Sequence, residues 1–277
     1  MKIGFCGQGW IGKNYADNFV KRGIDVVRYS QEIEYIDNKD KIKDCDVVFI
    51  AVPTPTTPKG FNSGILEKVI SLCNNIVVIK STIMPGTTEK LQKLYPNKTI
   101  LHSPEFLTEA TAKYDAAYPK RNIIGYIDDK GREAANEVMK LLPDAPYKAV
   151  VPAMTAELIK YGGNCWFYFK VIYINLLYDL AERMGVDYEM VKEAMSFDNR
   201  IGFTHLDPIH HSGRGAGGHC FIKDFAAFRE MYEELCKDDD TGLNLIKLME
   251  EKNIELLKKS NKDLNLLEGV YGERIKK

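Results

Sequence analysis

One cysteine stands among residues that could make its thiol reactive. Cys220 lies within GRGAGGHCFIKD, residues 213–224, whose glycines leave little side-chain bulk near the thiol. A helix is predicted to begin close to Cys220, and the partial positive charge at a helix N-terminus lowers the pKa of a thiol. Lys223 would add positive charge, and Asp224 could position a water molecule. We interpret Cys220 as a candidate nucleophile, with a structural thiol as the alternative. The glycines past which a substrate could approach are Gly215, Gly217 and Gly218.

A second candidate site is the glycine-rich segment GFCGQGWIG, residues 4–12. Gly7, Gly9 and Gly12 have GxGxxG spacing, follow a predicted strand and open a predicted helix. In that context the first glycine permits a tight turn, the second lets a pyrophosphate approach the backbone, and the third allows close packing of helix on sheet. The sequence therefore predicts dinucleotide binding.

The end of the second predicted strand lacks the acid that usually binds the adenosine ribose. The strand ends with Arg28, Tyr29 and Ser30. Arg28 beside Ser30 could accommodate a 2′-phosphate, which favours NADP. Alternatively Arg28 is a surface residue, and Glu32 or the backbone serves the ribose. We expect NAD, with NADP as the alternative.

Two further groups of polar residues could take part in redox chemistry. Glu157, Lys160 and Asn164 are spaced i, i+3 and i+7 and share one face of a predicted helix. A lysine beside a nicotinamide can hold an alkoxide or take its proton, and an amide can orient it; a polar stripe on a helix is the alternative. Glu105 and Glu109 lie one turn apart if their segment is helical, and could act as base and water activator or cap a helix.

The first half of the chain alternates short β-rich runs with helical stretches, which predicts βαβ units around a mainly parallel sheet. Helical patterns cover residues 66–73 and 131–142. The expected strands are residues 2–6, 25–29, 46–52, 76–80, 99–102, 122–127 and 148–151.

After residue 152 the pattern becomes helical. Residues 154–184 form one long helical pattern that is apolar over most of its circumference and stops at Gly185. Further helices are expected at residues 188–197, 221–236 and 243–259. The predicted fold is α/β: a Rossmann-type doubly wound sheet (residues 1–150), an all-helical domain with one long central helix (151–262) and a charged tail (263–277).

Composition excludes several classes of protein. The 277 residues carry 38 basic and 39 acidic side chains, a balance typical of a globular protein without a field that attracts nucleic acid or an anionic membrane. No signal peptide or long apolar run is evident, so we expect a soluble, cytoplasmic protein with reduced cysteines. His210 and His211 are adjacent, and His219 lies beyond a glycine-rich loop, so we expect no metal site.

Seven ordered motifs resemble the UDP-glucose/GDP-mannose dehydrogenases, which oxidise the C6 alcohol of a nucleotide sugar to a carboxylate. The resemblance covers residues 1 to about 260. The motifs are GFCGQGWIG (4–12), VPTPTTPKG (52–60), STIMPGTT (81–88), SPEFLTEA (103–110), AELIKYGGN (156–164), DNRIG (198–202) and GGHCFIKD (217–224).

The resemblance implies two successive oxidations with NAD in polysaccharide biosynthesis. Lys160, Asn164 and a water would support oxidation of the alcohol, and Cys220 would form a thiohemiacetal and then a thioester. Glu109 or Asp224 would help to activate the hydrolytic water, with Glu105 and Thr82 near the reacting carbon.

The binding residues that the resemblance implies form two sets. Those for the cofactor are Gly7, Gly9, Trp10, Ile11, Gly12, Ser30, Val52, Pro53, Thr54, Thr82, Glu109 and Lys223. Those for the substrate are Phe106, Leu107, Lys160, Asn164, Gly217 and Arg200, the last across a homodimer formed by the long helix.

Three departures from the family pattern bear on the substrate. The chain ends where family members continue into a third domain that holds the substrate's nucleotide, the segment between the second and third strands is short, and Ser30 replaces the ribose-binding acid. A smaller substrate, a separate chain that completes the site, or a truncated chain would each account for the first.

Three functions remain open. The first is a nucleotide-sugar dehydrogenase that uses Cys220 for double oxidation. The second is a two-electron hydroxyacid-type dehydrogenase, which shares the lysine and asparagine but does not need Cys220. The third is a non-catalytic or partner-dependent cofactor-binding protein.

Overall fold

The computed structural model describes residues 1–276, without the side chains of Arg274 and Lys276. The chain forms two compact units. Unit 1 contains Met1–Thr54 and Asn62–Lys160, and unit 2 contains Pro55–Phe61 and the chain from Tyr161 onward.

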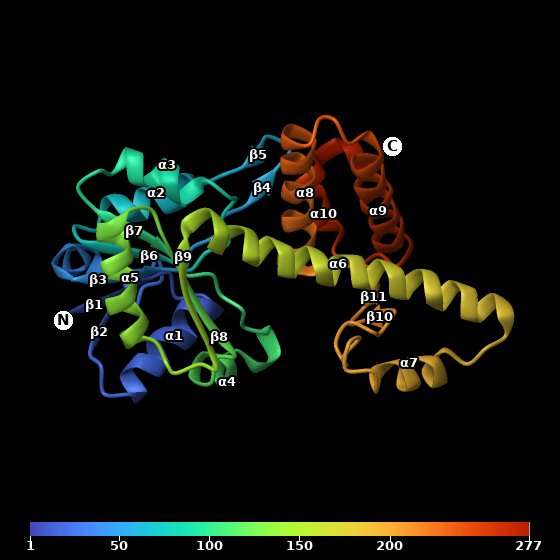
Figure 1. The fold of residues 1–277 in the computed structure, drawn as a ribbon, viewed down its shortest axis with the longest axis horizontal. Helices are drawn as coiled ribbons and strands as arrows, with labels where there is room; N and C mark the ends of the chain where they lie inside the picture. Colours follow the sequence, from blue (N-terminus) through green and yellow to red (C-terminus); the bar gives the residue numbers. More distant parts are fainter. Residues whose placement is uncertain (277) are drawn as a thin grey trace. The chain divides into compact units, whose positions relative to one another are not determined.

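Unit 1 is built on a seven-stranded sheet (Figure 1). Neighbouring strands are parallel except β7 and β8, which pair antiparallel through His102 and Gly125. Because β1 and β3 are neighbours while β2 lies on the other side of β1, the strand order reverses between β1 and β3, where α/β proteins bind ligands. In sheet order the strands are β2 (Val26–Tyr29), β1 (Ile3–Cys6), β3 (Val47–Ile50), β6 (Ile76–Ile79), β7 (Thr99–His102), β8 (Arg121–Tyr126) and β9 (Tyr147–Pro152).

Alternate residues of these short strands face opposite sides of the sheet, and both sides are covered. Phe5 of β1 and Phe49 of β3 stack at 4.9 Å between ring centroids, and Phe19 of α1 meets Phe5 edge-on at 5.1 Å. Helices α1, α4 and α5 cover this face. The helical segments of unit 1 are α1 (Trp10–Lys21), η1 (Ile36–Asp44), α2 (Gly64–Ser71), α3 (Thr87–Leu94), η2 (Glu109–Thr111), α4 (Ala112–Ala117) and α5 (Asp129–Leu141).

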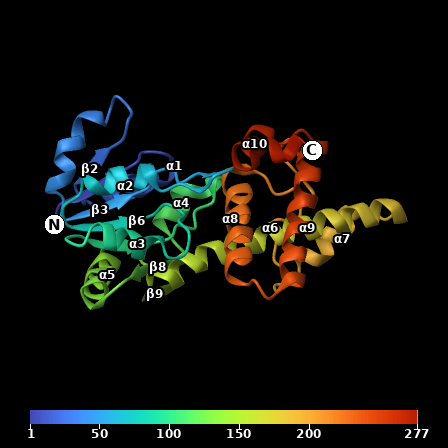
Figure 2. The ribbon, with the colours of Figure 1, turned by 90° about the horizontal axis from the view of Figure 1, so that it is seen from above.

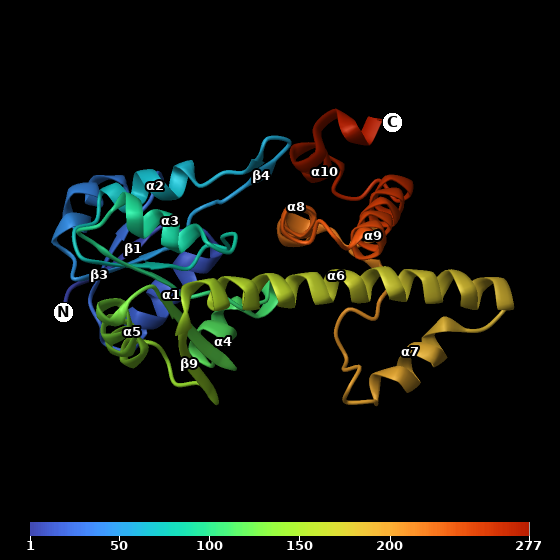
Figure 3. The same ribbon diagram turned by 45° about the horizontal axis from the view of Figure 1, so that its top comes forward.

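Unit 2 is organised along α6 (Ala153–Met184), a helix of 32 residues whose first turns belong to unit 1. Figure 3 shows α8 and α9 on one side of α6 and α7 on the other. Tyr168 of α6 stacks on Phe225 of α8 at 3.7 Å and forms the centre of a core shared with α9. The remaining elements are α7 (Tyr188–Ser196), β10 (Ile209–His210), β11 (Gly213–Arg214), α8 (Gly218–Leu235), α9 (Asp240–Lys259), α10 (Leu264–Tyr271) and η3 (Gly272–Lys276).

The predicted fold class is confirmed, with two short hairpins added to the expected elements. One of them, β4 (Thr56–Thr57) and β5 (Gly60–Phe61), was not predicted. It packs against α8 and α10 and therefore belongs to unit 2, although its sequence lies within the expected first domain. The contacts also divide the two units at Lys160 rather than at residue 150, because the first turns of α6 pack on unit 1.

The prediction of a charged tail at residues 263–277 is wrong for most of that segment. Residues 264–271 form α10, which packs beside α8 and α9 (Figure 2). Leu267 and Tyr271, one turn apart, are buried there, and so short a helix is stable only through such packing. Lys277, the last residue of the expected tail, lies outside the described residues.

Candidate functional site

The glycine turn after β1 has the geometry that a pyrophosphate requires. Gly7 has φ +88°, and a Cβ there would lie 2.1 Å from the carbonyl oxygen of Ala51. A Cβ at Gly12 would lie 1.9 Å from the carbonyl oxygen of Gly7, whereas a Cβ at Gly9 would meet no heavy atom within 4 Å. The outer glycines are therefore needed for packing, and Gly9 faces open space.

The start of α1 completes this turn. Gly9 is the N-cap and supplies no side chain to the first N–H groups, and no acidic residue lies in the first turn. Trp10 and Ile11 are the first two residues of the helix. N–H groups at such a helix start bind anions, so the residues present fit the phosphates of a dinucleotide.

The loops after β3 and β6 are tied together beside that turn. The Ser81 hydroxyl accepts from the Val52 N–H at 2.9 Å and donates to the Val52 carbonyl at 2.7 Å. The Thr54 hydroxyl donates to the carbonyl of Thr82 at 2.6 Å. These bonds hold the segment around Pro53 at the carboxyl ends of the strands. Ser81 is a site residue that sequence reasoning missed, although it stands beside Thr82 in a quoted motif.

The end of β2 offers a hydroxyl where related folds place a carboxylate. Ser30 Oγ accepts from the Glu32 N–H at 3.2 Å. The Arg28 guanidinium pairs with Asp17 at 2.6 Å, so the arginine considered for a 2′-phosphate is engaged by an acid of α1.

A cluster of buried charges follows the ends of β6 and β7. Lys80 and Glu105 are each 3% exposed and Lys160 is 8% exposed. Lys80 Nζ lies 3.2 Å from Ser103 Oγ and 4.2 Å from the centroid of the Tyr15 ring. Desolvation lowers the pKa of Lys80 to about 8, although Glu105 opposes the shift. Desolvation also raises the pKa of Glu105, and Lys160 and Lys80 oppose that shift.

Sequence reasoning missed Lys80. The signal available was a lysine placed directly after the apolar strand IVVI, where burial is expected on both faces. His102 at the end of β7 is also fully buried, and desolvation lowers its pKa to about 3, so this imidazole is neutral.

Phe106 and Leu107, the two residues after Glu105, make different contacts. The Phe106 ring lies 3.7 Å from the Arg121 guanidinium and 5.7 Å from Lys160 Nζ. The Leu107 N–H donates to Glu105 Oε1 at 2.9 Å, while the Leu107 side chain packs on the hydrophobic core. Among the described residues, Glu105 Oε2 has no hydrogen-bond partner. One carboxylate oxygen is therefore fixed and the other is available.

The condition under which Glu105 and Glu109 would lie one helical turn apart is not met. Glu105 precedes the short η2 helix, and Glu109 is its exposed first residue. Glu109 lines a separate hollow with Asn14 and Lys21 of α1. Thr108, the residue before η2, has an extended backbone (φ −95°, ψ 134°), so no helix joins Glu105 to Glu109.

The three polar residues of α6 have different partners. The Glu157 carboxylate accepts from the N–H groups of Gly86 at 2.6 Å and Thr88 at 2.8 Å, and from the Thr88 hydroxyl at 2.5 Å. Glu157 therefore stabilises the start of α3. Lys160 faces the charged cluster of unit 1, and Asn164 lies one turn further along α6 in unit 2.

Cys220 is exposed and is the third residue of α8. Asp224, one turn on, is 1% exposed. Its Oδ2 accepts from Asn164 Nδ2 at 2.6 Å, and its Oδ1 lies 2.5 Å from Lys223 Nζ. The thiol, carboxylate, amide and ammonium are thus gathered on one turn of α8 and the facing part of α6.

The interpretation of the glycines before Cys220 needs correction. A Cβ at Gly217 would lie 2.1 Å from Asp263 Oδ2, and one at Gly215 would lie 2.9 Å from Asn253 Oδ1. These two glycines are required by close packing within unit 2. Only Gly218, with φ +75° and no atom within 4 Å of its Cβ position, faces open space.

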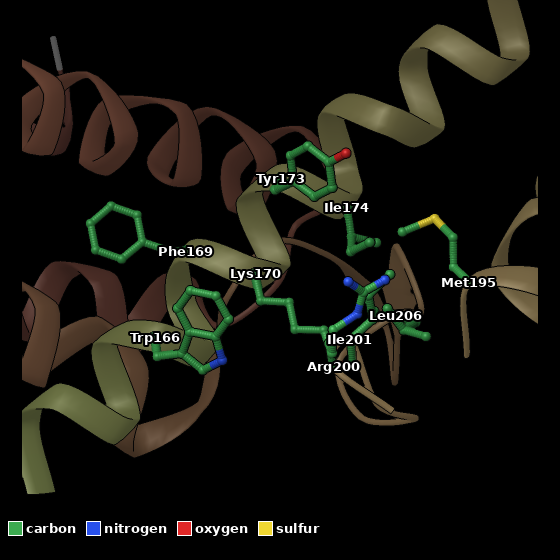
Figure 4. A pocket seen from close by; sticks show the side chains of 9 residues that line it. All are labelled: Trp166, Phe169, Lys170, Tyr173, Ile174, Met195, Arg200, Ile201 and Leu206. Carbon is green, nitrogen blue, oxygen red and sulfur yellow. The ribbon is translucent and has the colours of Figure 1, made fainter. Parts of the chain in front are cut away.

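Arg200 lines a hollow of unit 2 whose lining residues do not include Cys220. Its guanidinium pairs with Asp198 at 2.6 Å, and its side chain is 90% exposed. Figure 4 shows the apolar hollow between α6 and the loop after α7. Its lining residues are Trp166, Phe169, Lys170, Tyr173, Ile174, Met195, Arg200, Ile201 and Leu206.

Within residues 1–276, no group of three or more His, Cys, Asp or Glu side chains is placed to hold a metal ion. No helix of that part of the chain is both long and apolar enough to cross a membrane.

Solved structures and curated proteins show what the chain is similar to. A UDP-glucose dehydrogenase from Pyrobaculum islandicum superimposes with a TM-score of 0.77 at 27% identity, over 93% of this chain and 70% of that one. The 3-hydroxyisobutyrate dehydrogenase of Mycobacterium tuberculosis, at 14% identity and a TM-score of 0.70, covers 99% of both chains and shows the fold alone. A UDP-glucose 6-dehydrogenase of Rhizobium meliloti is 33% identical over 76% of this chain and 50% of its own length.

The chain spans between a third and about half of the length of the curated relatives it matches. Residues 28–142 match the NAD binding domain of one enzyme family, and residues 154–255 match the central domain of the same family. These two ranges include the strand ends that carry Thr54, Thr82 and Glu105 and the helices that carry Lys160, Asn164 and Cys220. The chain belongs to the UDP-glucose/GDP-mannose dehydrogenase family.

Proposed function

We propose that the protein oxidises the C6 primary alcohol of a nucleotide sugar, with UDP-glucose as the first candidate, to a carboxylate in two successive two-electron steps. The observation that carries the proposal is the exposed Cys220 on the first turn of α8, with the Asp224 carboxylate one turn away and held by both Asn164 and Lys223. A simple alcohol dehydrogenase has no need of a thiol at this place.

In the first step the substrate alcohol becomes an aldehyde. The Lys160 ammonium and the Asn164 amide hold the alcohol oxygen and stabilise the negative charge that develops when its proton leaves. Glu105, whose second oxygen is available, balances the charge of Lys160 and lies in the same buried cluster. Burial strengthens these interactions because water does not screen them.

In the second step Cys220 forms a covalent bond to the substrate. Its sulfur attacks the aldehyde carbon and gives a thiohemiacetal, which is oxidised to a thioester. Water then attacks the thioester carbonyl, the carbon–sulfur bond breaks, and the carboxylate leaves while the thiol is restored. Asp224 accepts a proton from that water, with Glu109 as the second candidate for this role.

NAD, when bound, accepts one hydride in each of the two oxidations. We assign the binding of its phosphates to Gly7, Gly9 and Gly12 with the start of α1 at Trp10 and Ile11, because Gly9 faces open space there. The remaining residues that we assign to the cofactor lie at the strand ends and beside the thiol: Ser30, Val52, Pro53, Thr54, Thr82, Glu109 and Lys223.

We also propose that two copies of the chain associate through α6. From Trp166 onward this helix exposes large apolar side chains, and leaving them in contact with water is unfavourable for a monomer. They include Trp166, Tyr173, Leu176 and Leu180, each between 49% and 62% exposed. In this arrangement Arg200 would serve the substrate of the second copy.

The decisive measurement is the amount of NADH formed per substrate consumed. The panel contains UDP- and GDP-sugars and simple hydroxyacids, and the variants are Cys220→Ser and, as a matched control at the residue that follows α8, Cys236→Ser. We expect two equivalents of NADH with a nucleotide sugar, lost in Cys220→Ser and retained in Cys236→Ser.

Other outcomes identify the alternatives. If one equivalent of NADH forms per substrate and the Cys220→Ser variant forms the same amount, the thioester route is rejected. That result would favour a two-electron hydroxyacid-type dehydrogenase. Cofactor binding without turnover on any member of the panel would favour a partner-dependent or non-catalytic protein.

A further inference from the structure

The glycine loop that precedes Cys220, residues 213–218, is held by side chains from a distant part of the sequence. Between the end of β11 at Arg214 and the start of α8 at Gly218 the loop has no regular structure. Asn253 of α9 accepts from the Ala216 N–H at 2.7 Å and donates to the Ala216 carbonyl at 3.0 Å. Ser260 Oγ accepts from the Arg214 N–H at 3.0 Å. The loop therefore owes its conformation to residues about 40 positions later in the chain.

Lys262 contacts the loop through a buried ammonium group. Its side chain is buried, at 5% exposure, and its ammonium donates to the carbonyls of Gly215 at 2.9 Å and Gly213 at 3.3 Å. A buried ammonium is unfavourable unless it is hydrogen-bonded, so the two carbonyls and the cation stabilise one another. Desolvation lowers the pKa of Lys262, which is consistent with this burial.

Asp263 holds the other end of the loop. Its Oδ2 accepts from the Gly218 N–H at 2.7 Å, at the first residue of α8 and two residues before Cys220. The closeness of this contact is evident at Gly217, where a Cβ would lie 2.1 Å from the same oxygen. Asp263 thus determines where the first turn of α8 begins.

Lys262 and Asp263 lie in the turn between α9 and α10, where two residues have an uncommon backbone conformation. Asn261 has φ +53° and Asp263 has φ +52°, a left-handed conformation that costs energy for residues other than glycine. Surrounding contacts must offset that cost. They include backbone hydrogen bonds to α9 and α10, such as Lys262 N–H to the Leu257 carbonyl at 2.9 Å, and the contacts of Lys262 and Asp263 with the glycine loop. Both residues lie beyond the range 154–255 that matches the family's central domain.

We propose that Lys262 and Asp263 are positioning residues for Cys220: by bonding to the backbone at both ends of the glycine loop they fix the first turn of α8, and with it the thiol. The inference rests on the proposed role of Cys220 in the oxidation. It adds that the last turn before α10 is part of the machinery that makes the thiol competent.

The test uses the full chain with Lys262→Met, which removes the ammonium and keeps an unbranched side chain. The matched control is Lys258→Met, because Lys258 also donates to a backbone carbonyl, that of Ile275 at 2.7 Å, but is exposed. Hydrogen exchange of the peptide that contains residues 213–221 and the alkylation rate of Cys220 by iodoacetamide need no substrate. Cys236, the residue that follows α8, is the internal reference for alkylation.

In Lys262→Met we expect about tenfold faster exchange in the loop peptide, because local opening no longer breaks the two carbonyl bonds. We also expect about a threefold or larger change in Cys220 alkylation relative to Cys236, and about a tenfold lower kcat with an unchanged dissociation constant for NADH. Loop exchange and Cys220 alkylation equal to those of Lys258→Met would overturn the proposal.

Two variants of Asp263 test the proposal independently of Lys262. They remain informative if Lys262→Met does not fold. Asp263→Asn keeps an oxygen that can accept from the Gly218 N–H, so it should behave like the wild type, whereas Asp263→Ala should resemble Lys262→Met. Equal effects of the two Asp263 variants would contradict a role through that hydrogen bond. Failure of the proposed function is seen separately, as turnover that is indifferent to Cys220→Ser.

Discussion

The charged cluster of unit 1 and the cysteine cluster of unit 2 use similar residue types in different surroundings. Lys80 and Glu105 follow strands of the central sheet and are each 3% exposed. Cys220 is exposed at the start of a helix, and the side chain of Lys223 is 19% exposed. The first cluster is positioned by the sheet, and the second by side chains that reach a glycine loop from elsewhere in unit 2.

This difference determines what a substitution in each cluster should change. Charges that are removed from water interact strongly, so substitutions among Lys80, Glu105 and Lys160 should alter stability and its pH dependence. Cys220 itself is exposed to water, so substitution of its thiol should mainly alter the rate of the reaction, whereas substitution of the buried Asp224 should alter both the rate and the stability. Three substitutions, ordered by decreasing size of the expected change, test this contrast.

The largest effect is expected for Asp224→Asn. The amide keeps the size of the carboxylate but cannot take a proton from water, and it loses the charge that binds Lys223. We expect overall oxidation to fall by about 10²- to 10⁴-fold, the usual contribution of a general base. The measurement is single-turnover hydrolysis of the acyl-enzyme, with Asp238→Asn, an exposed residue just beyond α8, as the control. Unimpaired hydrolysis in Asp224→Asn would leave Glu109 as the base.

A smaller effect, on stability, is expected for Glu105→Gln. It leaves the buried Lys80 and Lys160 without their carboxylate, which should lower the free energy of unfolding by about 3 kcal/mol. Glu109→Gln, at an exposed position four residues later, should change it by less than about 0.5 kcal/mol. Urea unfolding at pH 7 measures both variants. Equal free energies of unfolding of the two variants would show that Glu105 does not stabilise the buried charges of Lys80 and Lys160.

The smallest effect is expected for the pH dependence of stability in Lys80→Met. The pKa of Lys80 is lowered from 10.5 to about 8 in the folded protein, so between these values the unfolded chain binds more protons. Stability should therefore rise with pH across this window, by at most about 1.4 kcal/mol per pH unit from this group. Urea unfolding at several pH values should show a smaller rise in Lys80→Met than in the exposed Lys90→Met. An identical rise in both variants would contradict the burial of a charged Lys80.

Much of the fold was predictable because its signals are local. The predicted strand segments, four to seven residues long, correspond to all seven strands of the sheet, and the long apolar pattern corresponds to α6. The glycine spacing after β1 predicted a tight turn, and Gly7 and Gly12 show why other residues are excluded. The motif around Cys220 placed the thiol on the first turn of a helix, where it lies.

The remaining features depend on contacts between residues that are distant in the sequence. The burial of Lys80 depends on Tyr15 and Ser103, the place of the β4–β5 hairpin in unit 2 depends on α8 and α10, and Gly217 is required by Asp263. The Gly218–Asp263 hydrogen bond joins residues 45 positions apart. Local periodicity and residue type are enough to identify the elements that form and the chemical groups that they carry. Which charges are desolvated and which glycines are crowded follows from tertiary packing, because burial depends on every element packed around a residue.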